Sequence, residues 1–144
     1  MLLYIVVVRY LIMVLGFKPQ FVDKIINETK LHTIREDKHR RWKVGNDIHF
    51  AIGVRTKNYN QFHKSRCKKV DEIEIIWNHP FRVDFNSSSC VMIDGKGYFS
   101  VIINNRRLGY SEICQLAKND GFANVNEFAE WFDSDFKGRL IHWF

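Results

Sequence analysis

Residues 28–38 constrain the possible fold more than any other part of the chain. They place a lysine, a histidine, a threonine and an arginine at the point where an apolar helical stripe ends and a short strand begins. A short strand cannot bury so many polar groups without partners, because an unpaired polar group in an apolar interior costs free energy. We therefore expect several of these side chains to face a groove or a ligand.

The rest of the chain reads as short strands mixed with a few helices. Alternating apolar residues indicate half-buried strands, apolar residues at helical spacing indicate helices, and glycine-rich turns separate them. Residues 94–97 are such a turn and predict a β-hairpin. The predicted strands are 13–17, 31–35, 48–54, 70–77, 90–93, 98–103 and 139–144; the predicted helices are one opened by Pro19 that runs to about Asn27, one capped by Ser111 and ended by Gly121, and one capped by Asn124 with Glu127 that buries Phe128, Trp131 and Phe132.

This order predicts an α+β fold, closed as a small β-barrel with short helices at its rim. A chain of 144 residues is expected to form one domain, which we place at residues 13–144. Residues 1–12 are interpreted as an extension ahead of a true start at Met13, with an extra strand or helix as the alternative. Arg9 splits this apolar stretch, so neither half reaches the roughly 20 residues that a membrane span needs, and we expect no membrane association.

Three widely spaced cysteines, Cys67, Cys90 and Cys114, do not suggest a disulfide framework. Reduced thiols are typical of cytoplasmic proteins, which is the location that we expect. The six histidines are scattered, without the spacing of a zinc site, so the sequence predicts no metal and no cofactor.

Positive charge is concentrated in the first half of the chain. The net charge is +6, and residues 30–69 hold twelve of the 22 Lys and Arg but only three of the 16 Asp and Glu. Such a basic segment favours a partner that carries phosphate groups. The alternative is a solvated basic face without a ligand.

The pattern of Lys30, Thr33 and Arg35, followed by Gly45 with Asp47 and then by residues 120–122, resembles the ASCH domain family of PUA-like β-barrels. The resemblance covers residues 13–143 and implies RNA binding. Some small ASCH proteins are also similar to amidohydrolases that deacetylate N4-acetylcytidine. For such an enzyme the resemblance assigns catalytic roles to Lys30, Thr33 and Asp120.

Two departures from the family pattern have structural consequences. Glu28 stands where the motif has a glycine that can take positive φ, and the acid Asp120 is one methylene shorter than the family's glutamate. In addition, Lys30 and Thr33 would point to opposite faces of a regular strand. They can act together only if Lys30 lies at a bend before strand pairing begins.

Several residues have both a binding and a structural interpretation. Arg35 contacts a phosphate or base edge, or it pairs with Glu36, Asp37 or Asp120. Trp42, between basic residues, stacks on a base or fills the core. His32 is interpreted as a satisfied, partly buried imidazole. The full set of predicted ligand-binding residues is Lys30, Arg35, Lys38, Arg40, Arg41, Trp42, Lys43, Arg55, Lys57 and Tyr59.

The sequence therefore supports two main hypotheses. The first is a domain that binds RNA or a nucleoside-like ligand in a polar cleft lined by Lys30, Thr33, Arg35 and Asp120 and flanked by the basic loop 40–43. The second is a small amidohydrolase with Thr33 as nucleophile, Lys30 as its activator and Asp120 assisting. A protein-interaction module is a third, supported only by exposed charge.

Overall fold

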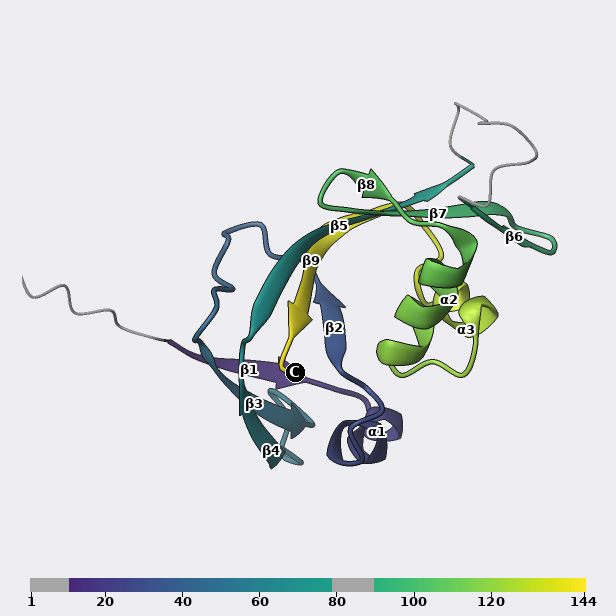
Figure 1. The fold of residues 1–144 in the computed structure, drawn as a ribbon. Coiled ribbons are helices and arrows are strands. Elements are labelled where there is room, and N and C mark those ends of the chain that lie inside the picture. Colours follow the sequence, from purple (N-terminus) through teal and green to yellow (C-terminus); the bar gives the residue numbers. More distant parts are fainter. Residues whose placement is uncertain (1–10, 79–89) are drawn as a thin grey trace, which may run out of the picture.

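The computed structural model describes residues 11–78 and 90–144, where nine strands, three α-helices and one 3-10 turn follow one another (Figure 1). The fold is therefore a small, mostly β, α+β arrangement. The strands are β1 (Ile12–Gly16), β2 (His32–Arg35), β3 (Asp47–Ile52), β4 (Asn60–Arg66), β5 (Lys69–Trp77), β6 (Val91–Ile93), β7 (Gly97–Ile103), β8 (Arg106–Arg107) and β9 (Phe136–His142). The helical segments are η1 (Pro19–Phe21), α1 (Val22–Ile26), α2 (Tyr110–Asn119) and α3 (Val125–Trp131).

These strands form two sheets. The smaller has the order β1-β3-β4, with β1 parallel to β3. The larger has the order β2-β9-β5-β7-β6, all antiparallel, and β8 extends it beside β7. No strand ladder within the described ranges joins the two sheets into a closed barrel. The α+β class is thus shown, and the PUA-like barrel stays a prediction.

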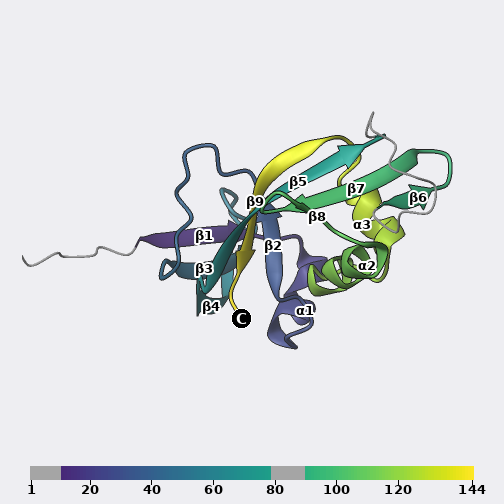
Figure 2. The same cartoon turned by 45° about the horizontal axis from the view of Figure 1, so that its top comes forward.

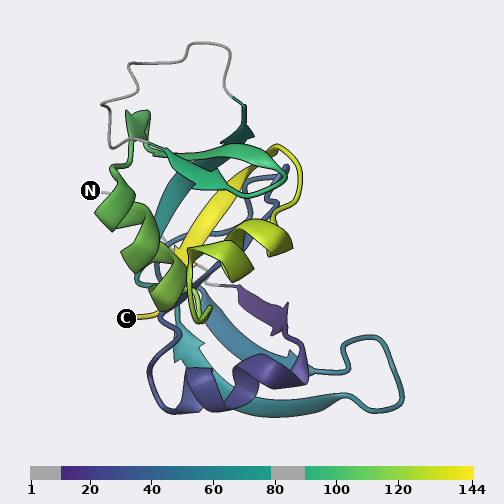
Figure 3. The same ribbon diagram turned by 90° about the vertical axis from the view of Figure 1, so that its right-hand side faces the viewer.

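Helices α2 and α3 lie next to each other, beside β2 and below β7 (Figures 1 and 2). Their buried residues join those of both sheets in one hydrophobic cluster, in which Phe50, Phe99 and Phe128 are fully buried. The loop between β3 and β4 projects away from this body, at the lower right of Figure 3. The candidate site lies where the end of β1, η1, β2 and the end of α3 meet.

Most predicted elements are present, including the hairpin of β6 and β7 across Gly95 and Gly97, which both have positive φ. Two strands were missed. β4 is polar and largely exposed, so it lacks apolar alternation, and its pairing with β3 comes only from the tertiary fold. β8 is only two residues long and has no pattern of its own.

Several predicted boundaries are wrong, most clearly those of α2 and β9. Helix α2 is capped by Gly109, not Ser111, because Gly109 has the extended backbone of a cap and its N–H donates to the Glu112 carboxylate. Strand β9 begins at Phe136, three residues before the prediction, because pairing with β5 continues through Gly138, and it ends at His142. The predicted extension at 1–12 falls mostly outside the described residues, although β1 already includes Ile12.

Candidate functional site

Lys30 lies just before strand β2, at the end of a bend that begins after α1. Glu28 takes a left-handed backbone with φ of 61°, a conformation that favours glycine. Because regular pairing starts only at His32, Lys30 lies before the part of the chain in which successive side chains must point to opposite faces. Lys30 and Thr33 can therefore face the same hollow, as the two-residue mechanism requires.

The Lys30 ammonium is buried against the end of helix α2. It is 2% exposed, and its Nζ donates hydrogen bonds to the backbone oxygen of Asp120 and, at 3.1 Å, to Asp120 Oδ1. The same Oδ1 accepts a hydrogen bond from Nδ1 of His32, also at 3.1 Å. Burial lowers the pKa of Lys30, and the Asp120 carboxylate opposes that shift. His32 is thus a satisfied, buried imidazole, as the sequence analysis expected.

Part of this arrangement satisfies the backbone carbonyl groups at the C-terminal end of helix α2. The last carbonyls of an α-helix lack partners within the helix and attract cations. Here the backbone N–H of Leu31 donates to the Asn119 oxygen at 2.7 Å, Lys24 Nζ donates to the Gly121 oxygen, and Lys30 takes the carbonyl between them. Lys30 consequently has a structural role whether or not it also contacts a ligand.

Arg35 and Thr33 form the second polar group of the site. Arg35 Nη2 donates to the Gly16 oxygen at 2.6 Å, and Nε donates to Thr33 Oγ1 at 3.3 Å. The guanidinium lies 5.0 Å from the centre of the Phe17 ring. Burial lowers the pKa of Arg35, with a smaller opposing effect from Asp120. None of the ion pairs proposed for Arg35 with Glu36, Asp37 or Asp120 forms between these described residues.

Both polar groups open into one cavity of about 370 Å³, a size typical of small-molecule sites. Lys30, Thr33, Arg35 and Asp120 all line it. The remaining lining residues are mainly apolar or aromatic, namely Gly16, Phe17, Lys18, Phe21, Ile34, Val54, Phe122, Trp131 and Phe132. The structure therefore brings the four predicted cleft residues together in a hollow with aromatic walls.

Trp131 was predicted as a core residue and that prediction is wrong. Its side chain is 44% exposed and lies at the cavity, edge-on to Phe21 at 5.4 Å and to Phe122 at 5.7 Å between ring centres. Lys18 Nζ lies 5.0 Å from the centre of its ring. Helical spacing puts Trp131 on the same side of α3 as the buried Phe128. Trp131 is, however, the last residue of α3, and its side chain lines the cavity instead of packing in the core. Sequence analysis missed Trp131, Phe17, Phe21 and Lys18 as site residues, since only tertiary packing gathers them.

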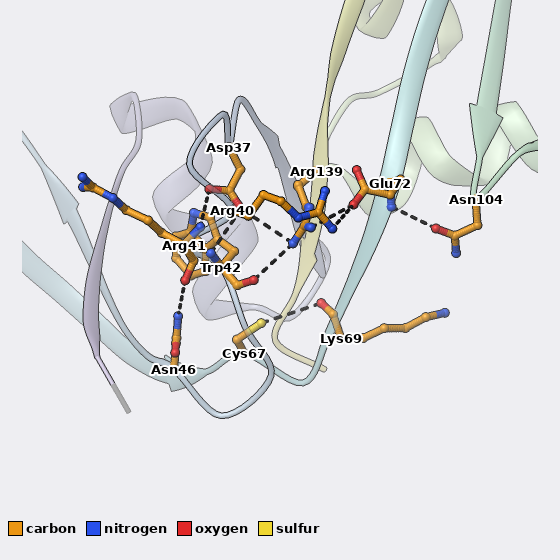
Figure 4. Close-up of polar contacts among 10 residues, drawn as sticks. All are labelled: Asp37, Arg40, Arg41, Trp42, Asn46, Cys67, Lys69, Glu72, Asn104 and Arg139. Atoms are coloured by element: carbon orange, nitrogen blue, oxygen red, sulfur yellow. Dashed lines mark hydrogen bonds and ion pairs between the residues drawn. The ribbon is translucent and has the colours of Figure 1, made fainter. Parts of the chain in front are cut away.

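The basic loop 40–43 was predicted to flank the cleft. It is part of the connection 36–46, which does not line the cavity. Its position is set by an ion-pair network around Arg139, shown in Figure 4. Arg139 lies 2.8 Å from Glu72 and 3.7 Å from Asp37, and Arg40 lies 3.2 Å from Glu72. The loop is therefore fastened to β5 and β9, away from the cavity.

Trp42 in that loop is 6% exposed and belongs to the core, so the core interpretation holds and the stacking interpretation does not. Asp37 fixes it by accepting hydrogen bonds from the backbone N–H groups of Arg41 and Trp42 (Figure 4). Lys38, Arg41 and Lys43 remain exposed on the loop.

A different basic loop borders the cavity. Val54 lines the cavity and is followed by exposed Arg55, Lys57 and Tyr59 in the projecting loop between β3 and β4. Arg55 takes a left-handed backbone with φ of 64°. These three predicted binding residues are thus better placed near the cavity than the residues of loop 36–46.

A further polar network, partly buried and not found by sequence analysis, extends from the site across the large sheet. The rings of His32 and His142 are in edge contact, 5.2 Å apart. His142 Nε2 is 2.9 Å from Asp71 Oδ2, and Asp71 Oδ1 accepts a hydrogen bond from Asn104 at 2.9 Å. Burial lowers the pKa of His142, and the hydrogen bond with Asp71 opposes it. Register explains the contact, because His32 pairs with His142 in the β2–β9 ladder.

Within residues 11–78 and 90–144, no group of three or more His, Cys, Asp or Glu side chains is arranged to hold a metal ion. In the same ranges no helix is long and apolar enough to cross a membrane. Comparison with models of known protein families, with curated proteins and with solved structures finds no match.

Proposed function

We propose that this protein is a PUA-like domain of the ASCH type that binds a nucleobase, from RNA or from a free nucleoside-like ligand, in the cavity between β1, η1, β2 and α3. One observation carries the proposal: the polar side chains of Lys30, Thr33, Arg35 and Asp120 converge on a hollow with aromatic walls. A planar base needs both features, since its faces stack on aromatic rings and its edges form hydrogen bonds.

The exposed ring of Trp131 is the surface on which we place the stacked base. Edge contacts with Phe21 and Phe122 hold the ring in position. The edge of the base would then meet Thr33, Arg35 and Asp120, of which Asp120 still has Oδ2 without a hydrogen-bond partner among the described residues. Such a site supplies both donors and an acceptor, which is what recognition of a base edge requires.

Titration of the full chain with nucleosides, nucleotides and single-stranded RNA tests this proposal. Stacking of a base on an aromatic ring contributes about 1–3 kcal/mol, so Trp131→Ala should weaken binding by roughly tenfold or more. Tyr110→Ala is the matched control, because Tyr110 is a similarly exposed aromatic, at 51%, that does not line the cavity. Absence of binding by all three kinds of probe at low salt would overturn the proposal.

A second candidate function is hydrolysis of an N4-acetylcytidine-type amide in the same cavity. It is favoured by the shared placement of Lys30, Thr33 and Asp120 and by the burial that lowers the pKa of Lys30. A neutral Lys30 amine would accept the Thr33 hydroxyl proton while Thr33 Oγ1 attacks the acetyl carbonyl. Cleavage of the C–N bond would release cytidine, which takes up that proton, and water would then release acetate from Thr33.

The contacts of Thr33 set the requirement for this chemistry. Its Oγ1 accepts from Arg35 Nε, and no hydrogen bond joins it to Lys30 within the described part of the chain. Substrate binding would therefore have to bring the Lys30 amine to the hydroxyl. Incubation with N4-acetylcytidine, followed by chromatography for cytidine and acetate, tests the activity. Turnover that persists in the isosteric variant Thr33→Val would exclude Thr33 as the nucleophile.

A further inference from the structure

The charges around the cavity are not balanced by the residues that line it. Lys18, Lys30 and Arg35 are its positive groups, and Asp120 is the one acidic side chain among the described lining residues. Asp120 pairs with Lys30 at 3.1 Å. Between residues 11–78 and 90–144, no carboxylate lies within ion-pair distance of Lys18 or Arg35. Two positive charges thus meet at the cavity with no counterion from the described part of the chain.

The orientation of the Arg35 guanidinium suits it to bind an anion. Its hydrogen bonds to Gly16 and Thr33 and its contact with the Phe17 ring fix the plane of the guanidinium. The Nη1 group has no acceptor among the described residues. A partly buried charge without a partner is costly, and a fixed guanidinium fork is well suited to phosphate or carboxylate oxygens.

Lys18 supplies a second, movable charge. Its side chain is exposed, and its amine lies over the face of Trp131 where we place the base. A base that stacks on Trp131 must displace this amine. The long, flexible lysine stem can carry the charge a few ångströms aside, where it would remain next to the bound ligand.

We infer that the ligand is a nucleotide unit rather than a neutral nucleoside, with its phosphate bound by Arg35 and Lys18 at the edge of the cavity. This inference rests on the proposed base-binding function. A phosphate neutralises both unpaired charges and accepts charge-assisted hydrogen bonds from each. A neutral nucleoside would leave both charges unpaired and would further reduce the contact of Arg35 with water.

The same base–phosphate chemistry occurs in a free nucleoside 5′-monophosphate and in an RNA strand. The exposed pair Arg55 and Lys57 follows Val54 at the edge of the cavity, where it could reach the phosphates of neighbouring nucleotides. This pair distinguishes the two sources, because only a strand is long enough to bring further phosphates to it.

The test compares four nucleosides with their 5′-monophosphates by isothermal titration calorimetry on the full chain, with ribose 5-phosphate as the probe for phosphate alone. A hydrogen bond to a charged group is worth enough to change affinity by about tenfold. At least one monophosphate should therefore bind about tenfold tighter than its nucleoside. Lys18→Ala should remove most of that advantage, so that the ratio of the two affinities falls toward one.

Lys18→Ala is the main variant because Lys18 is exposed and contributes little to packing; Arg35→Gln is the second, checked for folding by circular dichroism. Lys96→Ala is the matched control, since Lys96 is an exposed lysine in the turn between β6 and β7, away from the cavity. Equal affinity for nucleoside and monophosphate would overturn this inference alone. Failure of every nucleoside, monophosphate and RNA to bind would overturn it together with the proposed function.

An RNA arm separates the two sources. A single-stranded RNA octamer should lose affinity in Arg55→Ala/Lys57→Ala, with a shallower salt dependence, while the 5′-monophosphates should not. Arg41→Ala/Lys43→Ala removes the same charge from the exposed loop that does not line the cavity. The strand is identified as the source if the octamer binds more tightly than the 5′-monophosphates and if this binding is weakened both by Lys18→Ala and by Arg55→Ala/Lys57→Ala. Equal affinity of the unmodified chain and of Lys18→Ala for the octamer would count against the phosphate site.

Discussion

At the scale of single residues, the site depends on one unusual backbone conformation. Glu28 adopts the left-handed region with φ of 61°, which lets the chain turn from α1 toward β2 and places Lys30 under the end of α2. A residue with a Cβ atom is strained there by about 1–2 kcal/mol. The chain tolerates this strain at an exposed position next to the site.

Glu28→Gly should therefore stabilise the protein by about 1 kcal/mol, because glycine adopts positive φ freely although it also gains freedom in the unfolded chain. Urea unfolding would measure the change. Asn27→Gly is the control, since Asn27 is exposed and has a φ of −82°, so glycine brings no relief there. Equal effects of the two substitutions would show that Glu28 is not strained.

At the scale of elements, the end of α2 connects the helix to the segment before β2. Gly121 has a φ of 93°, and a Cβ atom at this position would lie 3.1–3.3 Å from the side-chain carbons of Lys30. The positive φ of the turn after α2 therefore favours glycine, and the close approach of Lys30 leaves little room for a Cβ atom. Predicting Gly121 as the end of α2 was correct, whereas its contact with Lys30 could only come from the structure.

We expect Gly121→Ala to lower the free energy of unfolding by more than Gly95→Ala. Both glycines have positive φ, so alanine should cost about 1–2 kcal/mol at each, but Gly95 has no atom within 4 Å of the added Cβ. The difference between the two variants measures the contact with Lys30. Chemical denaturation of both would give it, and no difference would mean that the Lys30 stem moves aside freely.

At the scale of the whole molecule, buried polar groups run from the cavity across the large sheet. They connect Lys30, Asp120 and His32 on one side with His142 and Asp71 on the other. Burial alone would raise the pKa of Asp71, but hydrogen bonds from Asn104 and His142 outweigh it, so its pKa lies below the ordinary value. His142 also faces Lys69, which lies 3.5 Å from Asp71.

This network makes stability depend on pH. The pKa of His142 is lower in the folded protein than its ordinary value of 6.5, so below pH 6.5 the unfolded chain binds more protons than the folded one. The free energy of unfolding should therefore fall as the pH drops from 6.5 toward the folded pKa. In His142→Gln the fall between pH 7 and pH 5.5, measured by urea unfolding, should be smaller. His39→Gln, at an exposed histidine, should keep the full fall; an undiminished fall in His142→Gln would contradict the assignment.

Local patterns in the sequence determined the order of most elements and singled out Lys30, Thr33 and Arg35 as polar groups in one short segment. Turn glycines, helix caps and apolar alternation act over a few neighbouring residues, so they can be recognised without tertiary information. The hairpin of β6 and β7 and the cap of α3 at Asn124, whose side chain accepts from the Glu127 N–H, were predictable for this reason. The polar strand β4 was not, because it is held only by pairing with β3.

Only the tertiary structure decided what surrounds the polar cluster. Asp120 reaches Lys30 from 90 residues away, and Trp131 and Lys18 meet at the cavity from opposite parts of the chain. It also separated two basic loops of similar composition, because the ion pairs of Arg139 hold one away from the cavity while Val54 places the other beside it. Composition reveals charge, but the packing of distant segments determines which charges face a ligand.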